Sequence, residues 1–446
     1  MTAWHTAYAW LPGGLARDVT LVAKGGRFTE INVRHTSGDL CPPEGATPLP
    51  GITFPGFANA HSHAFHRALR GHTQHERGSF WTWRNALYAL AGRLDPDRYL
   101  ALARATYAEM ALAGVTTVGE FHYLHHGPGG QRYDEPNAMG EALIEAADDA
   151  GIRITLLDAC YLAGGLAAGG HLPLEGVQQR FGDGHVDGWA GRFASLRSSE
   201  SVRIGAAIHS VRAVPSEALA VVAEVAGEQP LHVHLSEQPA ENEACMGVYG
   251  ISPTALLHAE GVLGASTTAV HATHVNASDI ATLGGTGTVV CICPTTERDL
   301  GDGIGPARAL ADAGSPLCLG SDQHAIIDLL EEARALEMND RLASLERGRF
   351  GVTELVDALS AGGQSSLGWD DAGVLAVGAR ADLVAVRLDS TRTAGAAPDQ
   401  ALLAAGAADV DTVVVDGRTV VSGGHHLLGD VGAMLSAAIE PLWTEQ

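Results

Sequence analysis

Short apolar runs alternate with longer helix-like stretches through the middle of the chain. Residues 98–113 and 216–226 have a helical pattern, and Pro215 stands at the start of the second, a favoured place for proline. Such alternation is typical of βα units and predicts a parallel sheet. We predict eight strands, at residues 52–59, 116–121, 153–158, 202–208, 230–235, 267–271, 288–293 and 316–320.

Eight strands with eight crossovers in about 300 residues fit a (β/α)8 barrel of the TIM type. The competing architecture is a doubly wound open sheet, but no Gly-x-Gly-x-x-Gly motif follows the first strand to favour it. We therefore predict an α/β protein with a TIM-like (β/α)8 barrel over residues 51–371 as its catalytic domain.

Strand-like segments also occur at both ends of the chain. Residues 19–22 and 28–33 flank Gly25-Gly26, a plausible hairpin turn, but so small a sheet needs a partner. Residues 381–386 and 412–417 supply one near the other end. We predict a small β-sandwich domain built from residues 1–50 and 372–446.

Composition and charge limit the binding partners and the cellular compartment that we expect for this protein. The chain has 446 residues, 46% hydrophobic and 18% charged, which is typical of a globular protein. Its net charge of −24 argues against nucleic acid or an anionic membrane as a partner, so an anionic substrate needs locally placed arginines. The six scattered cysteines, the lack of an export signal and the lack of a membrane-spanning apolar run favour the cytoplasm. Twofold dimers are common among enzymes of this size, and we expect a homodimer.

Histidines stand where the predicted strands end, and barrels of this type carry their active sites at those ends. Side chains alternate along a strand, so His61 and His63 point to the same face. One divalent metal can be gripped by such a pair together with further nitrogen and carboxylate ligands. The remaining candidates at strand ends are His209, His232, His234, His271 and Asp322.

We choose His61, His63, His234 and Asp322 as the metal ligands, because His234 lies nearer the barrel mouth than His232. His232 is either a ligand or a packed core residue. Zinc, iron and manganese all suit such a ligand set. The only lysine of the chain, Lys24, lies in the terminal domain, which excludes a pair of metals bridged by a carbamylated lysine. Cys291-x-Cys293 stands on a buried strand and is predicted to pack rather than to bind metal.

These residues, with Glu237 three positions after His234, resemble the amidohydrolase superfamily and its mononuclear-zinc deaminase branch. More narrowly, five segments resemble the formimidoylglutamate deiminase family, whose members hydrolyse N-formimino-L-glutamate to N-formyl-L-glutamate and ammonia in histidine breakdown. The segments are His61-Ser62-His63-Ala64-Phe65, Phe80-Trp81-Thr82-Trp83-Arg84, Glu120-Phe121-His122-Tyr123-Leu124-His125-His126, His209-Ser210-Val211-Arg212-Ala213-Val214 and Gly320-Ser321-Asp322.

The resemblance implies one zinc ion per subunit and a role for each site residue. Glu237 and His271 would act in catalysis, and we expect Asp322 to help accept a proton from water. The family has a glutamine where this chain has His66, which can still donate a hydrogen bond to a carboxylate. The residues implied to hold the substrate are Arg84, Tyr123, His209 and Arg212, with His66 in place of the glutamine.

Two other functions remain open from the sequence. The first is a related zinc aminohydrolase that acts on a purine- or triazine-like ring, whose pocket needs aromatic stacking surfaces more than paired arginines. The second is a barrel that has lost catalysis and serves as a binding protein, against which the full set of metal ligands and acid–base residues argues. Because a fold does not determine a function, the barrel itself favours none of them.

Overall fold

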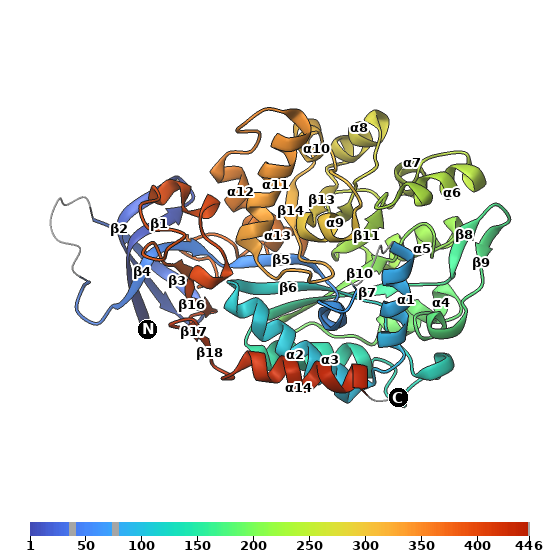
Figure 1. The fold of residues 1–446 in the computed structure, drawn as a ribbon, viewed down its shortest axis with the longest axis horizontal. Coiled ribbons are helices and arrows are strands. Elements are labelled where there is room, and N and C mark those ends of the chain that lie inside the picture. The colour runs from blue at the N-terminus through green and yellow to red at the C-terminus, as the bar shows by residue number, and fades with distance from the viewer. Residues whose placement is uncertain (35–41, 74–79, 445–446) are drawn as a thin grey trace.

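The structure is a computed structural model that describes residues 1–34, 42–73 and 80–444. Its centre is a sheet of eight strands in which every neighbouring pair is parallel (Figure 1). The strands, in sheet order, are β14 (Leu317–Leu319), β13 (Val289–Ile292), β12 (Thr267–His271), β11 (Leu231–Leu235), β10 (Val202–Ile208), β7 (Arg153–Cys160), β6 (Val115–His122) and β5 (Phe57–Ser62).

The two edge strands of this sheet meet at their carboxyl ends and nearly close a barrel. The backbone N–H of His63 donates to the carbonyl of Asp322 (3.1 Å), and the N–H of Asp322 donates to the carbonyl of His61 (2.9 Å). A parallel bridge between Ser62 and Asp322 marks the same seam. The predicted (β/α)8 fold is therefore confirmed.

Helices cover the outside of the barrel (Figure 1). The longest begins at Pro96, where the Asp95 side chain accepts from the N–H of Arg98 and caps the helix. Among the described residues, no helix combines the length and the apolar character that crossing a bilayer requires. The helices are α1 (Phe80–Ala91), α2 (Pro96–Leu112), α3 (Ala138–Ala150), α4 (Val186–Phe193), α5 (Ser216–Ala226), α6 (Pro239–Tyr249), α7 (Pro253–Ala259), α8 (Ala277–Thr286), α9 (Pro294–Leu300), α10 (Ala307–Ala313), α11 (Leu329–Ser344), α12 (Val352–Leu359), α13 (Ala361–Ser366) and α14 (Val431–Thr444).

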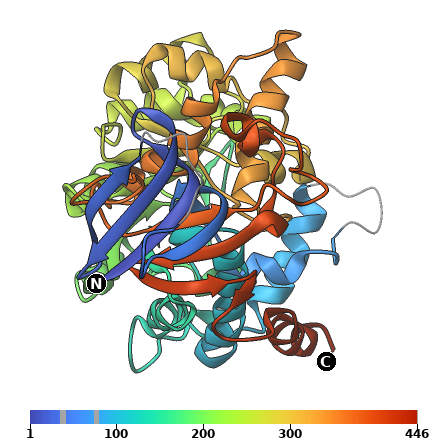
Figure 2. The ribbon, with the colours of Figure 1, turned by 90° about the vertical axis from the view of Figure 1, so that its left-hand side faces the viewer.

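A second, mixed sheet combines strands from both ends of the chain, as predicted (Figure 2). The predicted turn at Gly25-Gly26 joins β2 to β3, and both glycines have positive φ (60° and 76°). Trp4, Phe28 and Leu383 belong to the apolar core of this sheet, which is separate from the large core of the barrel. In sheet order its strands are β18 (His425–His426), β17 (Arg418–Ser422), β16 (Val410–Val415), β15 (Leu383–Val386), β4 (Thr47–Pro55), β1 (Thr2–Leu11), β2 (Gly14–Lys24) and β3 (Arg27–Val33).

The strand predicted at residues 52–59 is wrong as a single element. It divides at Gly56 into β4, which pairs in the terminal sheet, and β5, which begins the barrel. A Cβ atom on Gly56 would lie 2.4 Å from Oγ1 of Thr116 and 2.8 Å from Cβ of Asp382. Only glycine therefore allows the chain to pass so close to both sheets as it crosses between them.

The last helix, α14, leaves the terminal sheet and packs against α2 on the outside of the barrel (Figure 1). Nε1 of Trp443 donates to the carbonyl of Ala68 (3.0 Å). The boundaries that we predicted for the two domains, at residues 50/51 and 371/372, stay a proposal.

Candidate active site and metal centre

The carboxyl ends of three strands bring three histidines and one aspartate together. His61 and His63 come from the end of β5, His234 from β11, and Asp322 from the turn after β14. The Nε2 atoms of His61 and His63 each lie 3.4 Å from Oδ1 of Asp322. Nε2 of His234 lies 3.1 Å from Nε2 of His61. The four predicted ligands thus converge on one point.

The hydrogen bonds of His63 and His234 leave lone pairs on the Nε2 atoms of these two rings. Nδ1 of His63 donates to the carbonyl of Phe121, and Nδ1 of His234 donates to the carbonyl of His209, both at 2.8 Å. Burial lowers the pKa of both rings well below the usual value, so both are neutral. Such Nδ1 hydrogen bonds orient metal-ligating histidines, and three nitrogens with one carboxylate oxygen suit a zinc ion. The residues therefore fit one divalent metal.

Both ring nitrogens of His271, at the end of β12, face carboxylates. Nε2 lies 3.7 Å from Oδ2 of Asp322 and 3.8 Å from Oε1 of Glu237, and Nδ1 lies 3.5 Å from Oε1 of Glu297. Burial alone would lower the pKa of His271, but Glu237, Glu297 and Asp322 outweigh it and raise the pKa to about 10. Burial raises the pKa of Glu237. His271 is thus arranged as a hydrogen-bond donor, and Glu237 as a group that can take up and release a proton.

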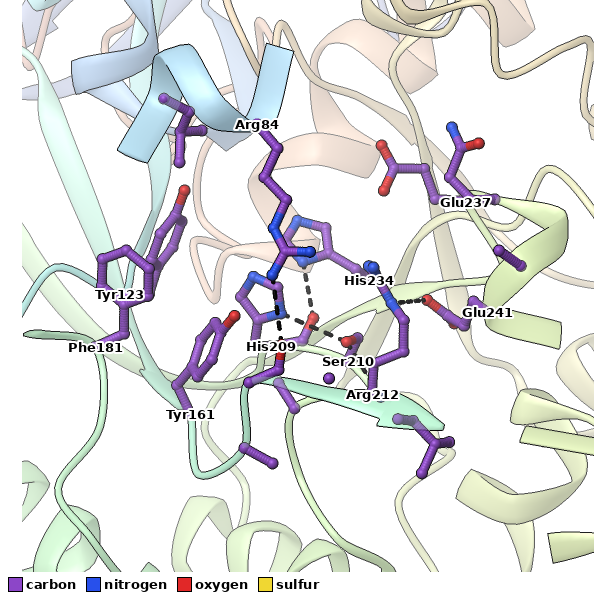
Figure 3. A pocket seen from close by; sticks show the side chains of 18 of the residues that line it. Arg84, Tyr123, Tyr161, Phe181, His209, Ser210, Arg212, His234, Glu237 and Glu241 are labelled. Atoms are coloured by element: carbon purple, nitrogen blue, oxygen red, sulfur yellow. Dashed lines mark hydrogen bonds and ion pairs between the residues drawn. The ribbon is translucent and has the colours of Figure 1, made fainter. Parts of the chain in front are cut away.

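A pocket opens beside these residues, and two arginines reach into it (Figure 3). Arg84 extends from α1, and its Nε donates to the hydroxyl of Tyr88 (2.6 Å). Arg212 follows β10, and its Nε donates to Oε2 of the buried Glu241 (3.0 Å). Burial alone would lower the pKa of Arg212, but Glu241 outweighs it and raises that pKa. Two permanent positive charges therefore line the pocket of a strongly acidic protein.

The three other residues predicted to hold the substrate line the same pocket. Nε2 of His66 lies 2.9 Å from the hydroxyl of Tyr123. The ring centroid of His209 lies 5.4 Å from that of Tyr123 and 5.1 Å from that of His234. The pocket wall is thus continuous with the proposed metal ligands.

Comparison with known proteins places this site in a family. A model of the amidohydrolase family matches residues 52–420. The chain belongs to the amidohydrolase family. It is 36% identical to a formimidoylglutamate deiminase from Pseudomonas aeruginosa over 96% of each chain. It is also 31% identical to an 8-oxoguanine deaminase from the same species, over 86% of this chain and 85% of that one. The predicted resemblance and the predicted class, a hydrolase acting on C–N bonds, are confirmed.

Solved structures share the fold over almost the whole chain. An amidohydrolase from Brucella melitensis is 31% identical, with a TM-score of 0.90 over 99% of this chain and 100% of that one. The atrazine chlorohydrolase TrzN from Arthrobacter aurescens TC1, solved in complex with zinc, is 23% identical, with a TM-score of 0.85 and the same coverage of both chains. The second likeness concerns the fold alone.

Tyr161, Glu241 and Glu297 are among the pocket or site residues that were not predicted from the sequence. Tyr161 lines the pocket and directly follows β7, as Tyr123 directly follows β6, so the strand-end rule would have found it. Glu241 and Glu297 lie inside the helices α6 and α9. In sequence, such acids look like those on any solvated helix face, and only the fold turns them toward Arg212 and His271.

Other candidates lie outside the site. His232 is fully buried, and its Nε2 donates to the carbonyl of Ser366 (3.1 Å), which makes it a core residue. Cys291 and Cys293 belong to a small buried cluster with Ala60 and Val270. Cys41 lies outside the described residues.

Proposed function

We propose that this protein hydrolyses N-formimino-L-glutamate to N-formyl-L-glutamate and ammonia, using one zinc ion held by His61, His63, His234 and Asp322. The observation that carries this proposal is the pair Arg84 and Arg212 in the pocket beside the acid–base residues. The substrate has an amidine at one end and two carboxylates at the other, and guanidinium groups bind carboxylates through two parallel hydrogen bonds. The likeness to a formimidoylglutamate deiminase supports the same substrate.

The site residues divide the reaction among them. The chemistry that zinc supplies when bound is a water molecule whose pKa is lowered toward neutrality. Asp322, one of the residues that would hold the zinc, would accept the proton of the water molecule that adds to the formimino carbon. Glu237 then passes a proton to the nitrogen that leaves as ammonia, and His271 hydrogen-bonds the oxygen on which negative charge develops. Arg84 and Arg212 hold the carboxylates away from this chemistry, together with Tyr123, His209 and His66.

The proposal is tested by measuring ammonia release from N-formimino-L-glutamate, with metal analysis of the same sample. We expect turnover by the wild type, and a Glu237→Gln protein that retains its metal but loses about 100- to 10,000-fold in kcat, because it lacks the proton carrier. The matched control is Glu243→Gln, in the helix α6 that begins two residues after Glu237, and outside the pocket. Near-normal turnover by Glu237→Gln would remove Glu237 from this scheme.

A second candidate is a deaminase that acts on a purine- or triazine-like ring. Aromatic side chains support it, because Trp83, Tyr88, Tyr123, Tyr161 and Phe181 also line the pocket, and an 8-oxoguanine deaminase is among the relatives. Comparing kcat/KM for N-formimino-L-glutamate and for 8-oxoguanine decides between them. We expect the first to be at least tenfold larger, because no ring substrate makes use of both arginines.

A further inference from the structure

Five polar side chains cross the seam of the barrel without touching the pocket. They come from β5, from β6 and from the turn after β14, and each is fully buried. None is among the residues that line the pocket. Buried polar groups destabilise a protein unless they are hydrogen-bonded, so the contacts among them need an account. The five residues, which we call the seam chain, are Asn59, Ser62, Glu120, Ser321 and His324.

The hydrogen bonds of the seam chain fit one arrangement of protons. Asn59 donates from Nδ2 to Oγ of Ser321 (2.7 Å), and Ser321 donates through that hydroxyl to Nδ1 of His324 (2.9 Å). Nε2 of His324 then donates to Oγ of Ser62 (3.1 Å), which donates to Oε2 of Glu120 (2.6 Å). The backbone N–H of Ser321 donates back to Oδ1 of Asn59 (2.9 Å). In the seam chain, each hydroxyl and each ring nitrogen thus has a partner that can donate to it or accept from it as this arrangement requires.

Residues of the seam chain are sequence neighbours of the proposed metal ligands. Ser62 stands between His61 and His63, and Ser321 directly precedes Asp322. Oε1 of Glu120 accepts from the backbone N–H of Ala64 (2.7 Å), on the other side of His63. The seam chain therefore holds the backbone directly after His63 and directly before Asp322, and Ser62 adjoins both His61 and His63.

The backbone near Asp322 is strained. Asp322 and His324 have φ values of +44° and +61°, in the left-handed region that non-glycine residues rarely adopt. The N–H of His324 donates to the carbonyl of Ser321 (2.8 Å), which tightens this turn. Such a conformation persists only where surrounding contacts impose it, and the side chains of Ser321 and His324 supply two of them.

We propose that Ser62 and His324 are positioning residues, which link β5 to the turn after β14 so that His61, His63 and Asp322 face one another at the distances a single metal ion requires. They touch neither substrate nor metal. Loss of the link lets the two edges of the barrel shift at the seam, and metal affinity falls although all four ligands remain. The inference rests on the proposed metal centre and does not depend on the identity of the substrate.

The test compares zinc affinity, measured by competition with a chromophoric chelator, across four full-length variants. Ser62→Ala and His324→Leu break the link, and we expect each to weaken zinc binding by about 10- to 100-fold, as outer-shell substitutions commonly do. His324→Gln retains a donor near the position of Nε2, and we expect it to recover most of the affinity. Once saturated with zinc, Ser62→Ala should have a KM within about twofold of the wild type, because the pocket is untouched.

The control variant loses a buried hydrogen bond elsewhere. Thr155 in β7 is fully buried, and its hydroxyl donates to the carbonyl of Leu367 (2.8 Å) and accepts from Nε1 of Trp369 (2.9 Å). We expect Thr155→Val to lower thermal stability but to keep wild-type zinc affinity. Equal zinc affinity in Ser62→Ala, Thr155→Val and wild type would overturn the proposal and leave the seam chain a purely structural role.

Three further outcomes are informative. Should Ser62→Ala fail to fold, Ser62→Cys keeps the side-chain shape with weaker hydrogen bonding, and wild-type zinc affinity in that variant would also overturn the proposal. A wild type that binds zinc but does not hydrolyse N-formimino-L-glutamate would refute the proposed substrate alone. Absence of zinc binding by the wild type would contradict both proposals.

Discussion

At the scale of single residues, the ion pair of Arg212 with Glu241 uses Nε of the guanidinium and leaves its two terminal nitrogens available. Glu241 accepts from Nε of Arg212 and from the backbone N–H of Ser236 (2.8 Å), and its side chain is fully buried. Within the described part of the chain, Nε alone of the Arg212 guanidinium makes a protein hydrogen bond. The two terminal nitrogens therefore remain for a carboxylate of the proposed substrate, which they would bind in the two-pronged geometry that arginine favours.

Arg212→Lys should raise KM for N-formimino-L-glutamate by about 10- to 100-fold with a smaller effect on kcat, because an ammonium group cannot keep the contact with Glu241 and also form a fork. Steady-state kinetics test this. Arg197→Lys, at an exposed arginine that bonds backbone carbonyls outside the pocket, is the control and should leave KM unchanged. An equal rise in KM for a substrate without carboxylates would contradict the proposed role.

Tyr161 is one of the pocket residues that the sequence pattern missed. Its ring centroid lies 4.4 Å from that of His209, and burial raises the pKa of its hydroxyl, which therefore stays protonated as a donor. Tyr161→Phe should raise KM about two- to tenfold at unchanged kcat, the effect of one hydrogen bond. The control is Tyr249→Phe, outside the pocket. Unchanged KM in Tyr161→Phe would show that its hydroxyl makes no contact with the substrate.

At the scale of elements, the sequence predicted which helices and strands exist better than it predicted the residues at which they begin and end. The helix at residues 216–226 matches α5 in full, because Pro215 marks its start. The strand at 52–59 was wrong, because an apolar run has the same pattern whether it lies in one sheet or passes between two. Only the neighbours of Gly56 in space, Thr116 and Asp382, show where it breaks. Such contacts between distant segments leave no signal in a single sequence.

Buried ion pairs, which the sequence pattern did not predict, join the helix α4 to the barrel. Arg192 donates from Nη1 to Oδ2 of Asp158 in β7 (2.6 Å), and from Nη2 to Oδ2 of Asp183 in the loop before α4 (2.9 Å). Nε2 of His126 lies 3.0 Å from Oδ1 of Asp183. Burial alone would raise the pKa of Asp183, but His126, His125 and Arg192 outweigh it and lower that pKa.

Asp183→Asn should lower the free energy of unfolding by about 3 kcal/mol at pH 7, because it leaves buried charge uncompensated. A carboxyl whose folded pKa is lowered stabilises the protein above its unfolded pKa of about 3.9, and this contribution is lost as the pH falls below that value. Urea unfolding at a series of pH values should therefore show the difference from wild type shrinking between about pH 5 and pH 3. Asp187→Asn, at an exposed acid in the first turn of the same helix, is the control. A difference that does not vary with pH would contradict this account.

At the scale of the whole molecule, the position of the site could be predicted because barrels of this type carry their active sites at the carboxyl ends of the strands. Histidines at the ends of predicted strands meet in the structure because parallel strands end at one rim. Segments some 260 residues apart in sequence, around His61 and Asp322, lie side by side at the seam. The union of the two termini was predictable because neither end has enough strands to stand alone. The way the terminal sheet is fastened to the barrel was not.

That fastening lies at the opposite end of the barrel from the site. Arg153 begins β7, is buried, and donates from Nη1 to Oδ1 of Asp382 (3.1 Å) and from Nη2 to Oγ1 of Thr117 (2.9 Å). Oδ1 of Asp416, a second carboxylate from the terminal part of the chain, lies 3.3 Å from Nη1 of Arg153. The guanidinium carbon also lies 5.2 Å from the ring centroid of Trp369. One arginine thus joins the base of the barrel to the terminal sheet.

Arg153→Met should lower the free energy of unfolding by about 3–5 kcal/mol, because it leaves the buried carboxylate of Asp382 without its cation. KM and zinc affinity should stay at wild-type values, since the amino ends of barrel strands carry stability and the carboxyl ends carry the chemistry. Arg203→Met is the control. Arg203 also lies over Trp369 (4.3 Å), but within the described residues its guanidinium donates only to the carbonyl of Ser199, at an exposed position, so its loss should cost less than about 1 kcal/mol. Urea unfolding and steady-state kinetics on the same samples check both expectations. A rise in KM as large as that of Arg212→Lys would mean that the junction with the terminal sheet controls the shape of the pocket, against the division of roles between the two ends of the barrel.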